Sequence, residues 1–151
     1  RSTQSRSSAA SDVYKRQVKY SRLSKNEYKA LLNASDIFLE RQIAGQKLLN
    51  YLCDKYKIAR IPLIVLDTPQ KGNGKCKTLG YYRVIPMLKI GQSITIYNLT
   101  AVKKKVVSIK VFTDTLLHEF MHHYDTEYLK IESAHTAGFY KRITDLKNKL
   151  S

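Results

Sequence analysis

All four histidines of this sequence fall between residues 118 and 135, and two of them flank a glutamate in the run His-Glu-Phe-Met-His at 118–122. Residues four apart on an α-helix lie one turn apart on the same face, so the imidazoles of His118 and His122 can converge on one metal ion. Imidazole nitrogen is a preferred ligand of zinc, and a glutamate beside the pair can act on water. The spacing therefore predicts a single Zn²⁺ per chain, with Glu119 as the catalytic acid–base residue.

A catalytic zinc site takes three protein ligands and leaves a fourth position open to water. His135 and Glu132 both follow the histidine pair and are the candidates for the third ligand. The metzincin pattern needs a histidine six residues after the second one, where this sequence has Tyr128, and a glutamate ligand is usual in gluzincins. We expect His135 to be the third ligand, with Glu132 as the alternative.

Other polar residues lie close to this run in the sequence. Asp125 follows His122 by three residues, so it falls on the ligand face and could orient the second ring nitrogen of a ligand, although an ordinary solvated aspartate is an equal alternative. His123 follows Glu119 by four residues and could contact it, but we expect it to be exposed to solvent. Tyr124 and Tyr140 could bind an oxyanion, but core packing is the expected role of both.

The elements that must position these residues follow from hydrophobic periodicity. Helical spacing of apolar residues changes abruptly near residue 58 to short β-branched runs, and it returns before the histidine cluster. We expect an α+β fold in which helices pack on a small, three- to four-stranded, mostly antiparallel sheet. The expected helices are 24–32, 35–56, 112–127 and 136–149, and the expected strands are 61–66, 78–84 and 93–98.

The sequence has 151 residues, of which 43% are hydrophobic and 26% charged, so one globular domain is expected and a disordered chain is not. Two cysteines, Cys53 and Cys76, are too few for a cysteine zinc cage, and we expect reduced thiols in a cytoplasmic protein. The longest apolar run is four residues, 63–66, which is far short of a membrane span. No membrane partner is expected.

Basic residues dominate the charge, because 27 lysines and arginines oppose 12 acidic residues and give a net charge of +15. A charge of this size favours an anionic partner such as nucleic acid. Lys103, Lys104, Lys105 and Lys110 precede the histidine helix and are candidates for contacts with DNA. The alternative is a solvated loop whose lysines protect a sheet edge from aggregation.

Residues 1–17 are unlike the remainder. They begin with a stretch rich in serine and arginine, and residues 12–17 resemble the translated end of an adapter used in sequencing libraries. We therefore interpret residues 1–17 as non-native or disordered and residues 18–151 as the domain. The basic character persists without them, because residues 18–151 hold 23 basic and 11 acidic residues.

The segment His-Thr-Ala-Gly-Phe at 135–139 resembles the His-x-x-x-Phe that follows the His-Glu-x-x-His helix in SprT-like zinc metallopeptidases, a group that includes SprT, YgjP and Spartan-type proteins. The order of elements from about residue 24 to residue 150 is also similar. This resemblance implies a minimal zincin fold in which His118, His122 and His135 hold zinc. It also implies hydrolysis of a protein or peptide substrate, in which Glu119 takes a proton from water. An extended substrate is expected to pair with strand 93–98.

The resemblance to Spartan-type members further implies substrates that are bound to DNA. Two other functions stay open on the residues alone. One is a basic nucleic-acid-binding module whose zinc is structural or absent. The other is a metallopeptidase of the ImmA/IrrE type, which cleaves a repressor, shares the first zinc motif and takes a different third ligand.

Overall fold

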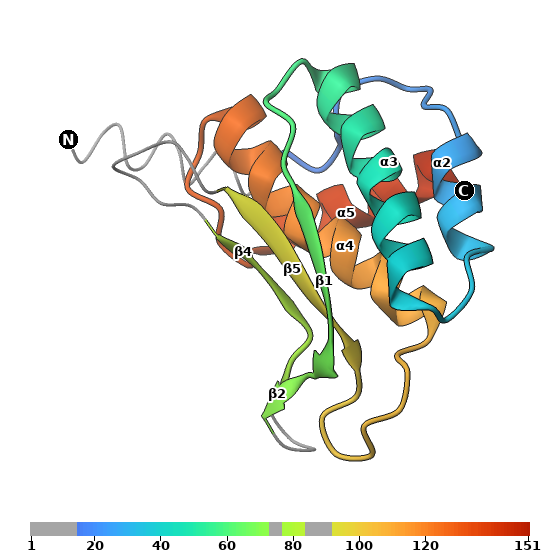
Figure 1. Ribbon diagram of the computed structural model, residues 1–151. Coiled ribbons are helices and arrows are strands. Elements are labelled where there is room, and N and C mark those ends of the chain that lie inside the picture. Colours follow the sequence, from blue (N-terminus) through green and yellow to red (C-terminus); the bar gives the residue numbers. More distant parts are fainter. Residues whose placement is uncertain (1–14, 73–76, 84–91) are drawn as a thin grey trace.

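The computed structural model describes residues 15–72, 77–83 and 92–151 (Figure 1). Most of the segment interpreted as foreign, residues 1–14, lies outside this description, as does Cys76. The helices are α2 (Asn26–Leu32), α3 (Phe38–Tyr56), α4 (Ile109–Tyr124) and α5 (Ala137–Leu150), and a π-helical turn, η1 (Asp125–Leu129), continues α4. The strands are β1 (Leu63–Pro69), β2 (Lys71–Gly72), β3 (Lys77–Thr78), β4 (Gly80–Arg83) and β5 (Ser93–Leu99).

The fold is α+β as expected, but the sheet is mixed rather than mostly antiparallel. Its strand order is β1-β5-β4, where β1 and β5 are parallel and β4 and β5 are antiparallel. The last strand in the sequence lies between the other two, and every residue from Ile94 to Asn98 is buried. Nearly continuous burial of this kind is typical of a central strand.

The two edges of the sheet differ. Two glutamines of α3 satisfy the backbone of β1 along its outer edge: Gln42 Oε1 accepts from the Val65 N–H at 2.8 Å, and Gln46 Oε1 accepts from the Leu63 N–H at 2.8 Å. Their amide groups donate to the carbonyls of Leu63 and Ile61. These side chains take the place of a neighbouring strand. The outer edge of β4 is different: among the described residues, no such pair of side chains covers it.

The helices pack together on one face of the sheet, and their shared apolar side chains form the core (Figure 1). α3 lies so close to β1 that a Cβ atom on Gly45 would come within 2.6 Å of Leu63 Cδ2. α4 buries the stripe predicted from its spacing, which comprises Leu116, Leu117, Phe120, Met121 and Tyr124. The exposed side of α4 is therefore held in a fixed position next to β4.

The ends of the two site helices differ slightly from the predicted ranges. α4 begins at Ile109, where the Ser108 hydroxyl accepts from the Val111 N–H at 3.2 Å, which is an N-cap. α4 ends at Tyr124, and the wider η1 turn closes at Lys130, which has a left-handed backbone (φ 57°). α5 begins after Thr136, whose hydroxyl accepts from the Phe139 N–H. His135 therefore lies in the connection that precedes α5.

The segment before α2 packs against the helices that carry the site. Val18 is buried; its N–H donates to Asp145 Oδ2 at 2.9 Å, and its carbonyl accepts from Lys149 Nζ. The Lys19 N–H donates to the Tyr124 hydroxyl at 3.1 Å. These bonds join the first described residues to α4 and α5. No helix in the described part of the chain has both the length and the apolar character needed to cross a bilayer.

Candidate metal centre

Three histidines converge at the C-terminal half of α4. His118 and His122 point from one face of α4, and the connection between η1 and α5 brings His135 against them. The Nε2 atom of His135 lies 3.2 Å from Nε2 of His118 and 3.1 Å from Nε2 of His122. One nitrogen from each ring lies within 4.8 Å of the other two. The cluster includes His135 and not Glu132. The structure therefore brings together His118, His122 and His135, the three residues expected to be the ligands.

The donor set fits a metal ion. A single ring nitrogen carries either one proton or one lone pair, so it makes a poor hydrogen-bond partner for two other imidazoles at once. Tetrahedral geometry with zinc–nitrogen bonds of about 2.0–2.1 Å places the ligand nitrogens roughly 3.3 Å apart, close to the two spacings found here. Three imidazoles that meet at one point match a site with a fourth position open to solvent.

His122 is held by a hydrogen bond to its other ring nitrogen. Its Nδ1 lies 2.8 Å from the hydroxyl oxygen of Ser133, and that hydroxyl donates to Asp125 Oδ2 at 3.0 Å. Because the single hydroxyl proton goes to the carboxylate, the Ser133 oxygen is left to accept a proton from Nδ1–H of His122. This tautomer keeps the Nε2 lone pair of His122 free for a metal.

Asp125 is itself held by a fully buried ion pair. Arg142 Nε lies 3.0 Å from Oδ1 and Arg142 Nη2 lies 2.7 Å from Oδ2, and both side chains have 0% exposure. Asp125 is therefore buried and paired rather than solvated, and its carboxylate reaches His122 through the Ser133 hydroxyl. Neither Ser133 nor Arg142 was identified from the sequence, which offers no local signal for either.

Phe139 explains part of the His-x-x-x-Phe pattern. Its ring is fully buried and lies beneath all three histidines, with ring centroids 4.6 Å from His122, 5.1 Å from His118 and 5.3 Å from His135. The ring limits the orientations open to each imidazole. One turn of helix from residue 136 brings this apolar support under the cluster, so the spacing of the pattern has a packing reason.

Burial changes the protonation of the site. It lowers the pKa of His122 to about 4, with further lowering from His118 and His135, and it lowers the pKa of His118 as well. The two imidazoles are therefore neutral at neutral pH, the form that binds metal. Burial also raises the pKa of Glu119 to about 7, a shift that a hydrogen bond from the Tyr82 backbone N–H opposes.

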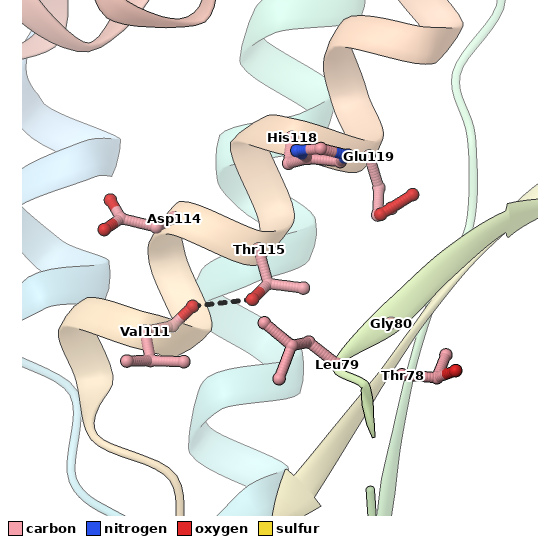
Figure 2. Close-up of a pocket in the computed structure, with 8 residues that line it drawn as sticks. All are labelled: Thr78, Leu79, Gly80, Val111, Asp114, Thr115, His118 and Glu119. Atoms are coloured by element: carbon pink, nitrogen blue, oxygen red, sulfur yellow. Dashed lines mark hydrogen bonds between the residues drawn. The ribbon is translucent and has the colours of Figure 1, made fainter. Parts of the chain in front are cut away.

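Glu119 lies between the histidines and the sheet. Its side chain projects from α4 toward β4, as Figure 2 shows, and accepts from the Tyr82 N–H. Leu79 O accepts from the Tyr97 N–H of β5 at 3.2 Å, so the backbone groups of Leu79 face β5. Because backbone groups alternate in direction along a strand, the N–H and C=O groups of Gly80 and Tyr82 face the outer edge of β4. A cleft of about 430 Å³ separates this edge from the histidines. Its lining comprises Gly80, Tyr81, Tyr82, His118, Glu119, His122, Thr126, Ser133 and His135.

His123 is buried, which contradicts the expectation that it is exposed. Its Nε2 lies 2.8 Å from the Ala59 carbonyl oxygen and its Nδ1 lies 3.2 Å from the Tyr82 hydroxyl, so it links α4 to the segment before β1 and to β4. Tyr124 belongs to the core as expected. Tyr140 is half-exposed, and its ring centroid lies 6.0 Å from that of His135 and 6.2 Å from that of His118.

The lysines considered for DNA contact lie away from the histidines. Lys103, Lys104 and Lys105 are exposed in the connection between β5 and α4, and Lys110 is exposed in the first turn of α4. Eight residues separate Lys110 from His118, which is about 12 Å along a helix axis. The four lysines therefore lie before α4 or in its first turn, whereas the histidines of the cluster lie toward its other end.

Comparison with family models, with curated protein sequences and with solved structures gives no significant match. The function of this chain is accordingly inferred from the residues of the site.

Proposed function

We propose that this protein is a zinc-dependent peptidase, similar to the SprT-like metallopeptidases. The observation that supports the proposal is the convergence of three imidazole Nε2 atoms, 3.1–3.2 Å apart for two of the pairs, next to a buried glutamate on the same helix. His118, His122 and His135 would hold the ion. Three neutral nitrogen ligands with an open fourth position are the ligand set of a catalytic rather than a structural zinc site.

When bound, zinc supplies Lewis acidity, which makes water acidic near neutral pH and polarises a carbonyl group. The chain supplies the proton transfers. A Glu119 carboxylate takes the proton from the attacking water and then gives it to the leaving nitrogen. The Tyr82 N–H holds the carboxylate toward the cleft.

The outer edge of β4 is the place where an extended substrate would bind. Strand 93–98, which we expected to pair with substrate, is the central strand β5 and has a neighbour on both sides, so that expectation was wrong. Gln42 and Gln46 cover the edge of β1. The β4 edge borders the histidine cleft, and backbone pairing along a sheet edge is a common way to bind an extended peptide.

The test is proteolysis of an unfolded protein, such as reduced casein, by the zinc-loaded full chain and by Glu119→Gln. We expect cleavage by the parent and a loss of at least 100-fold in the variant, because proton transfer by a positioned residue contributes about 10²–10⁴-fold. Both proteins should contain the same amount of zinc, because Glu119 is not a ligand. Equal cleavage by the two zinc-loaded proteins, or none by the parent, would overturn the proposal.

A further inference from the structure

A groove extends from the metal centre along the N-terminal half of α4. It has a volume of about 540 Å³ and lies between α4 and the start of β4 (Figure 2). The groove shares Gly80, His118 and Glu119 with the histidine cleft, so the two form one continuous depression. The remaining lining residues are Thr78, Leu79, Val111, Asp114 and Thr115.

The walls of the groove are mainly apolar. Figure 2 shows the Leu79 side chain directed from the strand segment toward α4, where it faces Thr115. The Thr115 hydroxyl donates to the Val111 carbonyl at 2.7 Å, so this group is already paired and the Thr115 methyl group is what the residue adds to the wall. Val111 supplies a second aliphatic surface. The groove therefore offers an aliphatic lining next to the reacting groups.

Gly80 keeps the strand close to the helix at this point. A Cβ atom on residue 80 would lie 2.7 Å from the Thr95 carbonyl oxygen and 3.0 Å from Thr115 Cγ2, and the first contact is with backbone that cannot move aside easily. The close approach of β4 to α4 sets the width of the groove where it meets the histidine cleft.

The charges of the groove disfavour an acidic ligand. The lining that the structure describes contains two carboxyl groups, Asp114 and Glu119, and none of the described lysines or arginines. Lys147 of α5 pairs with Asp114 at 2.8 Å and so partly compensates that charge from outside the lining. A carboxylate placed in the groove would meet the like charge of these two groups.

For a substrate that pairs antiparallel to β4, the direction of this strand determines which substrate residue the groove would receive. β4 runs from Gly80, at the groove, to Tyr82, whose N–H contacts Glu119 at the metal centre. A substrate paired antiparallel to β4 runs the opposite way, from the metal centre into the groove. The side chain that enters the groove then belongs to the residue that follows the scissile bond.

We propose that this groove selects substrates with an apolar side chain, such as leucine or methionine, in the residue immediately after the scissile bond, and that it rejects aspartate and glutamate there. This inference rests on the proposed peptidase function. An aliphatic side chain would bury its surface against Leu79, Val111 and Thr115.

The test uses matched peptides that differ in one residue, which is leucine, glycine or aspartate, with products identified by mass spectrometry. One to three kcal/mol of differential contact in an apolar pocket corresponds to about 10- to 200-fold in kcat/KM. We expect the leucine peptide to be cleaved at least 10-fold faster than the glycine peptide, with leucine at the new N-terminus, and the aspartate peptide to be cleaved slowest.

Two matched variants test the groove itself. Val111→Phe fills it from a position that is 39% exposed, so the fold should tolerate the change, and Val102→Phe makes the same substitution at a 67% exposed position in the β5–α4 connection. Val111→Phe should lower kcat/KM for the leucine peptide about 10-fold more than it lowers kcat/KM for the glycine peptide. Val102→Phe should change neither.

Different failures overturn different claims. If the zinc-loaded parent cleaves the peptides at equal rates, or if Val111→Phe slows all of them equally, the groove inference is wrong and the peptidase proposal stands. If the zinc-loaded parent cleaves none, the peptidase proposal is wrong. In that case, binding of the same labelled peptides to Glu119→Gln, measured by fluorescence anisotropy, tests the groove inference. If adding Val111→Phe to Glu119→Gln weakens binding of the leucine peptide, the groove inference is supported. If the two proteins bind the leucine peptide equally, it is refuted.

Discussion

Substituting Ser133 with alanine tests how the metal centre is held. The Ser133 hydroxyl connects His122 Nδ1 to the buried Asp125–Arg142 pair, at 2.8 Å on the histidine side and 3.0 Å on the aspartate side. Its removal leaves all three ligands in place and leaves Asp125 paired with Arg142. What is lost is the group that fixes the tautomer and the orientation of one imidazole.

The expected magnitude follows from these contacts. Partners that orient a metal ligand typically contribute about 10- to 100-fold to metal affinity. That range corresponds to about 1.4–2.7 kcal/mol, the size expected for one hydrogen bond that involves a charged group. We therefore expect Ser133→Ala to bind zinc about 10- to 100-fold more weakly than the parent, with a stoichiometry of one. Ser133→Thr keeps the hydroxyl and should recover part of the loss.

The assay is competition for zinc against a fluorescent chelator at fixed pH, with the free energy of unfolding measured in parallel. Ser108→Ala is the matched control, because it removes a helix N-cap worth about 1 kcal/mol of stability and touches no ligand. The control should lose stability and keep its zinc affinity. If Ser133→Ala binds zinc as tightly as the parent, the Ser133 hydroxyl does not position His122. The same conclusion follows if Ser108→Ala weakens zinc binding as much as Ser133→Ala does.

Three further predictions follow from other parts of the structure. Arg142→Met leaves the fully buried Asp125 carboxylate without this ion pair, and urea unfolding should show a loss of about 3–5 kcal/mol. Burial raises the pKa of the Cys53 thiol to about 12 from the roughly 8.5 of an exposed thiol. In a Cys76→Ser background, thiol reagents should therefore modify Cys53 only at the rate of unfolding. The contribution of this thiol to stability should be complete below about pH 8.5 and should decline as the pH rises toward 12, since only the unfolded chain ionises there. If residues 103–105 contact DNA phosphates, replacing those three lysines with alanine should reduce the slope of log K against log salt by about 2–3 and leave cleavage of short peptides unchanged; an unchanged slope would refute the contact.

Local periodicity was enough to predict the part of the site that lies on one helix. His118, Glu119 and His122 take their relative positions from the helical repeat, and the apolar stripe of α4 gives its buried face. His135 depends on how the chain returns after η1, so its role was expected from the residue type and from the resemblance rather than from the helix. The structure places it in the cluster.

Contacts between distant segments were beyond what the sequence could predict. Arg142 is a buried cation on α5, and its spacing says nothing of Asp125, 17 residues earlier. The mixed sheet was also not predicted, because apolar runs indicate that strands exist but not that β5 lies between β1 and β4. That insertion made β4 the edge strand at the site in place of 93–98. His123 looked solvated because its partners, Ala59 and Tyr82, come from other elements.

The central claim is that His118, His122 and His135 form one zinc site, and the most direct measurement is metal content by native mass spectrometry of the untagged full chain beside His135→Ala and Glu132→Ala. We expect one zinc ion in the parent and in Glu132→Ala, and a loss or strong weakening of binding in His135→Ala. A parent that takes up no zinc from excess metal, or a His135→Ala variant that binds it as tightly as the parent, would contradict the three-histidine centre and the peptidase function built on it.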